Sequence, residues 1–213
     1  TPALLLRSKI PNPNGLIGKN LRLHPVVGCV AALPREIKVW DGAPMTTVSN
    51  AGSGGSDGSH YGVKLECPSV HVAFGGAQLP WINPMQSKRD LLLLPNAFVT
   101  IALCRDKGSG SVTIDSNGDA RLYYPMAQHD RNSLVEGSEM LIRLSAAVGA
   151  DKIMSSVIPL EGVFDLPSPE EATEEKRREI VDQYVEKMAE AGVTANFRNL
   201  ILSAHQMGTA KMS

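Results

Sequence analysis

The stretch Phe98-Val99-Thr100-Ile101-Ala102-Leu103-Cys104 is the strongest indication of the fold in this sequence. It is short, almost entirely apolar and rich in β-branched residues, which is typical of a strand in the middle of a sheet. A second apolar run, Val26 to Leu33, predicts another buried strand. Tyr61 to Cys67 alternates apolar and polar residues, so we expect a strand with one buried face there.

A β-hairpin is expected next along the chain. Residues 111–115 and 119–124 flank Ser116-Asn117-Gly118, and Asn-Gly readily takes the positive φ that a tight hairpin turn needs. Residues 200–204 indicate one more strand or tight buried segment, which leads into His205. Residues 3–8 indicate the end of a helix, because the Pro- and Gly-rich residues 11–15 follow it.

Helix signals appear in three further places. Residues 82–94 begin with Asn83 as a cap and Pro84 in the first turn. Residues 130–148 form the second helix, which Gly149 ends. Its expected buried stripe consists of Leu134, Leu141, Leu144 and Val148.

The third helix is expected over residues 169–191, with Gly192 as its C-terminal cap. Ser168-Pro169-Glu170-Glu171 has the pattern of a capping box with proline at the first helical position. The buried stripe is expected to consist of Ile180, Val181, Tyr184, Val185 and Met188. The order of these elements predicts an α+β fold, with a mixed or antiparallel sheet and helices on one face.

Composition excludes some classes of function. The 213 residues carry 21 Lys and Arg against 22 Asp and Glu, a net charge of −1, and only 5% are aromatic. A nucleic-acid binder usually has a basic surface or aromatic stacking residues, so we expect no nucleic-acid partner. No apolar run approaches the ~18–20 residues of a membrane span. Cys29, Cys67 and Cys104 lie in mostly apolar stretches without CxxC spacing, which predicts buried, reduced thiols.

Common catalytic and metal-binding patterns do not occur. The glycine-rich segments 52–54 and 108–110 precede no helix that could bind a phosphate, so we interpret them as plain loops. Ser203 lies close to His205 but has no GxSxG elbow around it. No metal site is expected, because the five histidines are widely scattered: His24, His60, His71, His129 and His205.

Two short segments stand out from this background. One is Gly18-Lys19-Asn20-Leu21-Arg22-Leu23-His24-Pro25, and the other is His205-Gln206-Met207-Gly208-Thr209-Ala210-Lys211-Met212. Taken alone, a histidine at position 205 has an ordinary structural explanation in a core or turn. The small Gly208-Thr209 pair would allow the backbone to approach a ligand closely, as a cofactor pocket requires.

Together these segments resemble the glucose-methanol-choline (GMC) flavin oxidoreductases. That family has a GxNLxDHP-like segment, which residues 18–25 match except that Leu23 replaces the usual Asp. It also has a late HxxGTxxM segment, matched by His205, Gly208, Thr209 and Met212. Residues 1–8 (TPALLLRS) resemble a further family signature, although Lys9 stands where glycine is usual.

The resemblance is closest to the long-chain (fatty) alcohol oxidases. Residues 203–208 (SAHQMG) match their SAHQMG segment, and residues 18–25 match their GKNLxLHP, in which leucine precedes the histidine. Residues 105–110 (RDKGSG) resemble their RDRGSG segment. Ala210 and Lys211 replace the Cys and Arg that these oxidases usually have, which is a mild departure.

The resemblance implies a domain division and a fragment. It identifies residues 1–25 as the tail of an FAD-binding Rossmann-like domain and residues 26–199 as a GMC-type substrate-binding α+β domain. Residues 200–213 would begin the catalytic return segment. The family's dinucleotide fingerprint would precede residue 1, and its second catalytic His or Asn would follow residue 213, so the chain is interpreted as an internal fragment that is inactive alone.

The resemblance also implies a reaction. FAD would accept a hydride at N5 from a long-chain primary alcohol, with His205 as the base for the hydroxyl proton, and O2 would be reduced to H2O2. An imidazole is largely neutral near pH 7 and can accept that proton. Gly208 and Thr209 are the candidate cofactor-binding residues.

Two alternatives stay open. One is another GMC alcohol dehydrogenase with a different electron acceptor, and the other is a non-catalytic α+β binding module, for which Ala210 and Lys211 are the only hint. Family resemblance also implies an intracellular membrane or peroxisomal location, with membrane association through segments outside these residues.

Overall fold

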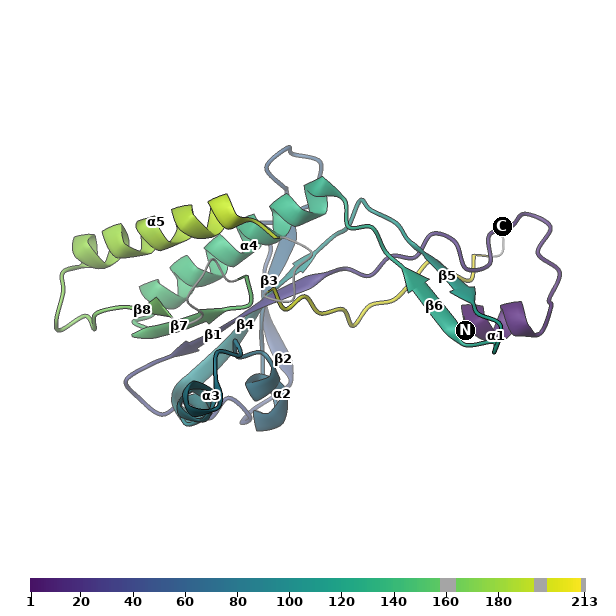
Figure 1. Ribbon diagram of the computed structural model, residues 1–213. Coiled ribbons are helices and arrows are strands. Elements are labelled where there is room, and N and C mark those ends of the chain that lie inside the picture. The colour runs from purple at the N-terminus through teal and green to yellow at the C-terminus, as the bar shows by residue number, and fades with distance from the viewer. Residues whose placement is uncertain (158–163, 194–198, 212–213) are drawn as a thin grey trace.

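The computed structural model describes residues 1–157, 164–193 and 199–211. Its main body is a six-stranded sheet in the order β2-β3-β4-β1-β7-β8, in which every neighbouring pair is antiparallel (Figure 1). A second, two-stranded sheet pairs β5 with β6. The strands are β1 (Val26–Ala32), β2 (Met45–Ser49), β3 (Val63–Pro68), β4 (Ala97–Cys104), β5 (Ser111–Ile114), β6 (Ala120–Tyr123), β7 (Lys152–Ser155) and β8 (Phe164–Asp165).

The helices are fewer and differ greatly in length. Two are long, α4 (Gln128–Ala147) and α5 (Glu174–Ala191). The others are α1 (Pro2–Arg7), α2 (Val72–Ala77), α3 (Pro84–Leu91) and the 3₁₀ turn η1 (Leu94–Asn96). None of the helices in the described part of the chain is both long and apolar enough to cross a membrane.

The two most apolar strands lie side by side at the centre of the sheet. β1 and β4 pair along their full length, from Val26 opposite Leu103 to Ala32 opposite Ala97. Every residue of β1 is buried. Both strands were predicted from their apolar character, and the structure confirms them.

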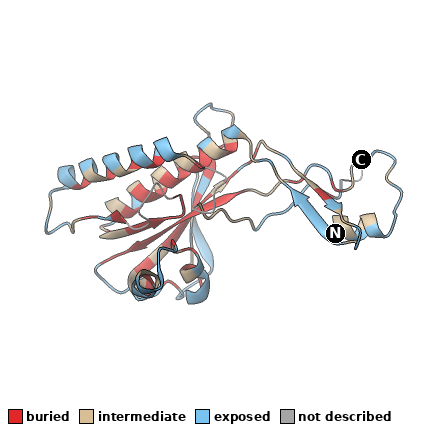
Figure 2. Ribbon diagram, in the orientation of Figure 1, coloured by how far each residue is buried: buried red, intermediate tan, exposed pale blue. Residues whose placement is uncertain are grey.

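Both faces of the central sheet are covered (Figure 2). Val27 and Cys29 belong to the apolar cluster that includes α4 and α5, whereas Val30 and Ala32 belong to a second cluster with Leu94. The long helices therefore lie on one face, and the short helices α2 and α3 lie on the other (Figure 1). The α+β class with an antiparallel sheet is confirmed. The helices expected on one face are the long ones, and α2 and α3 cover the other face as well, which explains why β1 has no polar face.

The hairpin and the helix signals before residue 150 are confirmed, although α3 ends at Leu91 rather than at Leu94, because the separate 3₁₀ turn η1 begins there. β5 and β6 pair around Gly118, which has φ +82°. Asn83 caps α3, because its Oδ1 accepts a hydrogen bond of 2.9 Å from the Gln86 amide. Gly149 follows α4 with φ +94°.

The predicted start of α5 is wrong. The helix begins at Glu174, and Thr173 caps it by accepting a hydrogen bond from the Lys176 amide. The capping-box bond at Ser168 does form, since its amide donates to the Glu171 carboxylate. That bond closes a separate turn, because Thr173 takes an extended conformation that interrupts the helical path.

Two burial predictions are also corrected. Leu144 and Val148, expected in the buried stripe of α4, are 45% and 52% exposed, because the last turns of the helix bury Leu141, Ile142 and Ser145 instead and Val148 follows the end of the helix. Residues 200–203 are half-buried rather than buried, and only Leu202 makes a strand-like bridge, to Val26. The predicted stripe of α5 is confirmed, with Val181, Val185 and Met188 buried.

An arm extends from the sheet body (Figure 1). It contains α1, the β5–β6 hairpin and the segments that lead from α1 to β1 and toward the C-terminus. The hairpin is tied to the N-terminal segment, because the Val112 amide donates to the Gly18 carbonyl at 2.7 Å. The domain boundaries at residues 25 and 200 remain predictions.

Candidate functional site

Three segments singled out in the sequence meet where the arm joins the sheet body. We call residues 18–25, 105–110 and 203–209 the motif junction. Leu21 and Gly110 exchange two backbone hydrogen bonds, of 3.0 and 2.8 Å. Arg22 and Met207 exchange two more, both of 3.0 Å. Residues 18–25 therefore pair with both other segments. In Figure 1 the purple N-terminal and yellow C-terminal traces both run along the arm.

Glycine permits this close pairing. Gly208 has φ +87°, and a Cβ placed there would lie 2.1 Å from the Asn20 carbonyl oxygen. Gly18 has φ +81°, and its amide donates to the Thr209 carbonyl at 2.8 Å. Contacts within the chain thus account for both glycines and for the burial of Thr209. A cofactor-binding role for Gly208 and Thr209 remains a prediction.

Asp106 is a buried carboxylate at the centre of the junction. Its Oδ2 accepts hydrogen bonds from the Leu23 amide at 3.0 Å and from the Tyr124 hydroxyl at 2.6 Å. Burial and that carboxylate raise the pKa of Tyr124, so its hydroxyl stays protonated and donates. Oδ1 accepts no hydrogen bond from the described residues, and His24 Nε2 lies 3.7 Å from it.

His24 has an unusual backbone. Its φ is +46°, in the left-handed region, and it precedes Pro25. Such a conformation costs about 1–3 kcal/mol in a non-glycine residue and persists only where surrounding contacts impose it. Those contacts are on the neighbouring Leu23, whose amide donates to Asp106 and whose carbonyl accepts a 2.5 Å hydrogen bond from Ser203 Oγ.

The predicted catalytic residue, His205, lies next to His24. Their ring centroids are 6.1 Å apart and the ring planes are inclined at 43°. His205 is exposed, as are the residues on either side of it. The structure thus brings one histidine of each motif together. The catalytic role of His205 stays a prediction, and Met212 of the same motif lies outside the described residues.

Sequence reasoning gave no role to His24, Asp106 or Tyr124. His24 and Asp106 lie within segments that the family resemblance had already marked, but that resemblance assigned neither a function. Tyr124 ends the hairpin and carried no signal of its own. His24, Asp106 and Tyr124 can be recognised as a group only when the structure shows that their segments are neighbours.

A pocket of about 460 Å³ opens beside His24. Among the described residues that line it, none is acidic, and Lys64 and Arg105 bring positive charge to its exposed rim. Arg105 also lies over the Tyr61 ring, with its guanidinium carbon 4.5 Å from the ring centroid. The pocket connects His24 to solvent, and 27% of the His24 side chain is exposed.

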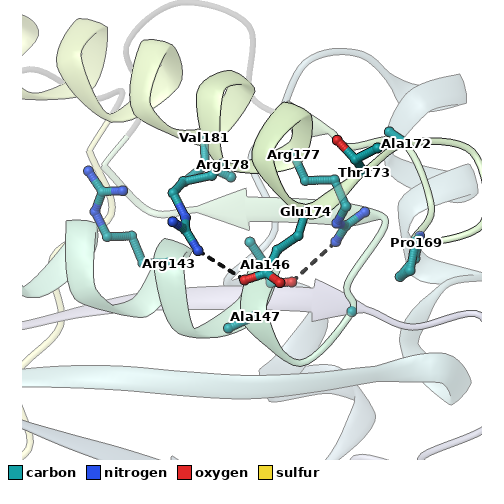
Figure 3. Close-up of a pocket in the computed structure, with 11 residues that line it drawn as sticks. Arg143, Ala146, Ala147, Pro169, Ala172, Thr173, Glu174, Arg177, Arg178 and Val181 are labelled. Atoms are coloured by element: carbon teal, nitrogen blue, oxygen red, sulfur yellow. Dashed lines mark hydrogen bonds and ion pairs between the residues drawn. The ribbon is translucent and has the colours of Figure 1, made fainter.

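A second pocket, of about 560 Å³, lies between α4 and α5 (Figure 3). Three arginines line it, Arg143, Arg177 and Arg178. Arg177 is buried and donates from Nη2 to the carbonyls of Ala146 and Ala150. This pocket includes none of the motif residues, and its buried arginine satisfies the C-terminal carbonyls of α4.

The cysteines and metal-binding groups add no further site. Cys29 and Cys104 are buried, and burial raises the pKa of each thiol to about 12. Cys67 is exposed, so the prediction of three buried thiols is wrong there. It lies on β3, whose side chains alternate between the core and the surface. The described residues contain no group of three or more His, Cys, Asp or Glu arranged to hold a metal ion.

Comparison with known proteins shows which proteins this chain is similar to. No family model matches the chain. Long-chain-alcohol oxidase FAO4A of Arabidopsis thaliana is 33% identical over 160 residues, which cover 72% of this chain and 21% of that protein. The Arabidopsis long-chain-alcohol oxidases FAO4B and FAO3 are 29% and 26% identical over all of this chain and 27% and 28% of their own lengths. The chain is similar to long-chain-alcohol oxidases.

This similarity confirms the resemblance seen in the motifs. The chain spans between a fifth and three-tenths of the length of these curated relatives. Two of the alignments extend over the whole chain, so they include all three segments of the motif junction.

Proposed function

We propose that the complete protein oxidises long-chain primary alcohols to aldehydes, with FAD as the hydride acceptor and O2 as the final oxidant, giving H2O2. The observation that carries this proposal is the exposed His205, held beside His24 by the pairing of two motifs in a chain similar to long-chain-alcohol oxidases.

The described residues fit a flavin-dependent site in that they leave the His205 side chain accessible. The His205 imidazole lies within a run of exposed residues, 204–208, so both an alcohol and a flavin held by other parts of the protein could reach it. FAD would supply the electron acceptor at N5, to which the alcohol carbon gives its hydride. Gly208 and Thr209 contact the chain itself, and any contact of theirs with FAD would add to those bonds.

His205 would do the acid–base part of the reaction. Its neutral imidazole accepts the hydroxyl proton, so that the oxygen carries negative charge as the hydride leaves. The Arg22–Met207 pairing positions this side chain, because it fixes the backbone two residues from His205. The side chain of Gln206 is fixed in turn by donating to the Ser203 carbonyl at 3.1 Å.

Substitution of His205 tests the proposal. In the complete protein, His205→Ala should lower alcohol turnover by about a hundredfold or more, while bound flavin persists. His129→Ala is the matched control, because His129 is also a histidine beside carboxylates, with Nε2 3.4 Å from Asp57 and Nδ1 3.5 Å from Asp130. Turnover is measured as peroxide release with a long-chain alcohol, and flavin as absorbance. Unchanged turnover in His205→Ala would refute the role of His205.

A further inference from the structure

We propose that His24, held by Asp106, relays the proton away from His205 to solvent during alcohol oxidation. This inference rests on the proposed function of His205 and adds a second pair of residues to it. The relay moves one proton only: it leaves the alcohol hydroxyl, passes to the His205 imidazole, then to His24 and finally to water, while the hydride and its two electrons go to the flavin.

Asp106 has one side-chain oxygen, Oδ1, that accepts no hydrogen bond from the described residues. The carboxylate is buried, with only 3% of the residue exposed, and both of its side-chain hydrogen bonds reach Oδ2. A buried carboxylate oxygen without a donor is costly. His24 Nε2, at 3.7 Å, faces that oxygen. When His24 takes up a proton, a small movement of its ring would let Nε2–H donate a hydrogen bond to this carboxylate oxygen.

The positions of the His24 and His205 rings also support the relay. A centroid separation of 6.1 Å is too long for stacking contact but leaves room for a proton to cross with one water molecule. His24 has a partly exposed side chain and lines the 460 Å³ pocket, so the proton can continue to solvent. The charged groups on that side are Lys64 and Arg105, both exposed, and His60 lines the same pocket.

The left-handed backbone of His24 ties this residue to both neighbouring segments. The chain maintains φ +46° there, and the contacts at Leu23 that impose it come from Asp106 and from Ser203. The same two contacts therefore orient His24 and tie it to the segment that carries His205.

The test uses His24→Asn, Asp106→Asn and the double variant in the complete protein. Asparagine tolerates the left-handed backbone at position 24, so the substitution removes the imidazole with little added strain. Each single variant should lower kcat by at least about tenfold, with KM for the alcohol and flavin content unchanged. The double variant should be no slower than the slower single variant, because the two residues act as one unit. His129→Asn is the matched control and should keep wild-type turnover.

A rescue experiment separates a relay from a structural role. Raising the concentration of a small basic buffer such as imidazole should restore much of the kcat of His24→Asn, because the buffer takes the proton from His205 directly. If His24→Asn loses its flavin, Asp106→Asn gives the same kcat readout, since it keeps the His24 imidazole and its side-chain oxygen can still accept from the Leu23 amide.

Each outcome bears on one proposal or the other. Wild-type kcat in His24→Asn, additive losses in the double variant, or a slow variant that buffer fails to rescue would overturn the relay. Full turnover in His205→Ala would instead overturn the proposed function on which it rests. Loss of turnover in His205→Ala together with wild-type behaviour of His24→Asn would refute the relay alone.

Discussion

Arg22 and Met207 exchange two backbone hydrogen bonds of 3.0 Å, which join the N-terminal part of the chain to its C-terminal part. Neither segment has regular secondary structure at this point beyond that single bridge. The junction is therefore built from contacts that are distant in sequence, which cost the most chain entropy to form. We expect it to open before the sheet body does, because the body is held by the paired strands β1 and β4.

Gly208→Ala should destabilise this junction. A Cβ would lie 2.1 Å from the Asn20 carbonyl oxygen, and the backbone would keep a φ of +87° that alanine disfavours. We expect a loss of at least about 2 kcal/mol in the free energy of unfolding of the arm. Hydrogen exchange of the Arg22 and Met207 amides measures that loss directly.

Gly42→Ala is the control for this substitution. Gly42 has nearly the same φ, +90°, but a Cβ there would meet nothing within 4 Å. Its cost is therefore conformational strain alone. Equal losses in the two variants would show that the approach to Asn20 has no influence on stability.

Ser203→Ala should weaken the same junction by less. Ser203 Oγ donates a half-buried hydrogen bond of 2.5 Å to the Leu23 carbonyl. Losing one such bond costs about 0.5–1.5 kcal/mol, measured by urea denaturation. Ser53→Ala is the control, because its Oγ donates to the nearby Asn50 carbonyl in an exposed loop. A larger effect at Ser53 than at Ser203 would contradict the importance of the bond to Leu23.

Local patterns were enough to predict the sheet body. The apolar run at 98–104, the similar run at 26–33 and the Asn117-Gly118 turn are all read from neighbouring residues, and each formed the expected element. The start of α5 was not predictable in this way. Ser168 has Glu171 at capping-box spacing, whereas Thr173 is followed directly by Glu174 and Glu175, and only the tertiary path of residues 168–173 decides which of the two hydroxyl residues begins the helix.

The candidate site likewise contains one residue that the sequence identified and several that only the structure reveals. His205 was identified because its whole motif is contiguous in sequence. His24, Asp106 and Tyr124 gain their meaning only from proximity, because the 3.7 Å and 2.6 Å contacts join three separate segments. Burial of Asp106 was unexpected as well, since charged residues are rarely found fully buried.

Alkaline pH should destabilise the folded chain through its buried thiols. The pKa of Cys29 and Cys104 is raised by burial from 9.0 to about 12. Because the folded pKa lies above the unfolded one, the stabilisation is complete below pH 9 and is lost as pH rises from 9 toward 12. Each thiol contributes a slope approaching about 1.4 kcal/mol per pH unit inside that window.

Urea denaturation at pH 8, 9 and 10, roughly the range in which an unperturbed thiol titrates, measures how the free energy of unfolding changes with pH. The double variant Cys29→Ala with Cys104→Ala should be less stable at every pH, because cavities remain, but should depend less on pH between 9 and 10. Tyr124 and Tyr184, whose pKa values are also raised by burial, add to the loss at higher pH. An unchanged slope in the double variant would assign the alkaline loss to other groups.

Two adjacent arginines of α5 should differ sharply in their effect on stability. Arg177 is buried against the end of α4, and its Nη2 donates to the Ala146 carbonyl at 3.2 Å (Figure 3). The same nitrogen also donates to the Ala150 carbonyl at 2.9 Å. Arg177→Met leaves those carbonyls without a charged donor, and we expect a loss of about 1–3 kcal/mol. Arg178 is exposed and pairs only with Glu174 among the described residues, so Arg178→Met should cost less than about 1 kcal/mol.

Salt distinguishes the two effects further. The Arg178–Glu174 pair is solvent-exposed, so the small cost of Arg178→Met should vanish in 1 M salt, where the screening length is about 3 Å. The cost of Arg177→Met should persist, because its bonds to the α4 carbonyls are shielded from solvent. Urea denaturation of both variants at low and high salt measures this, and a loss at Arg177 that disappears in high salt would show that the guanidinium acts by long-range charge rather than by capping the helix.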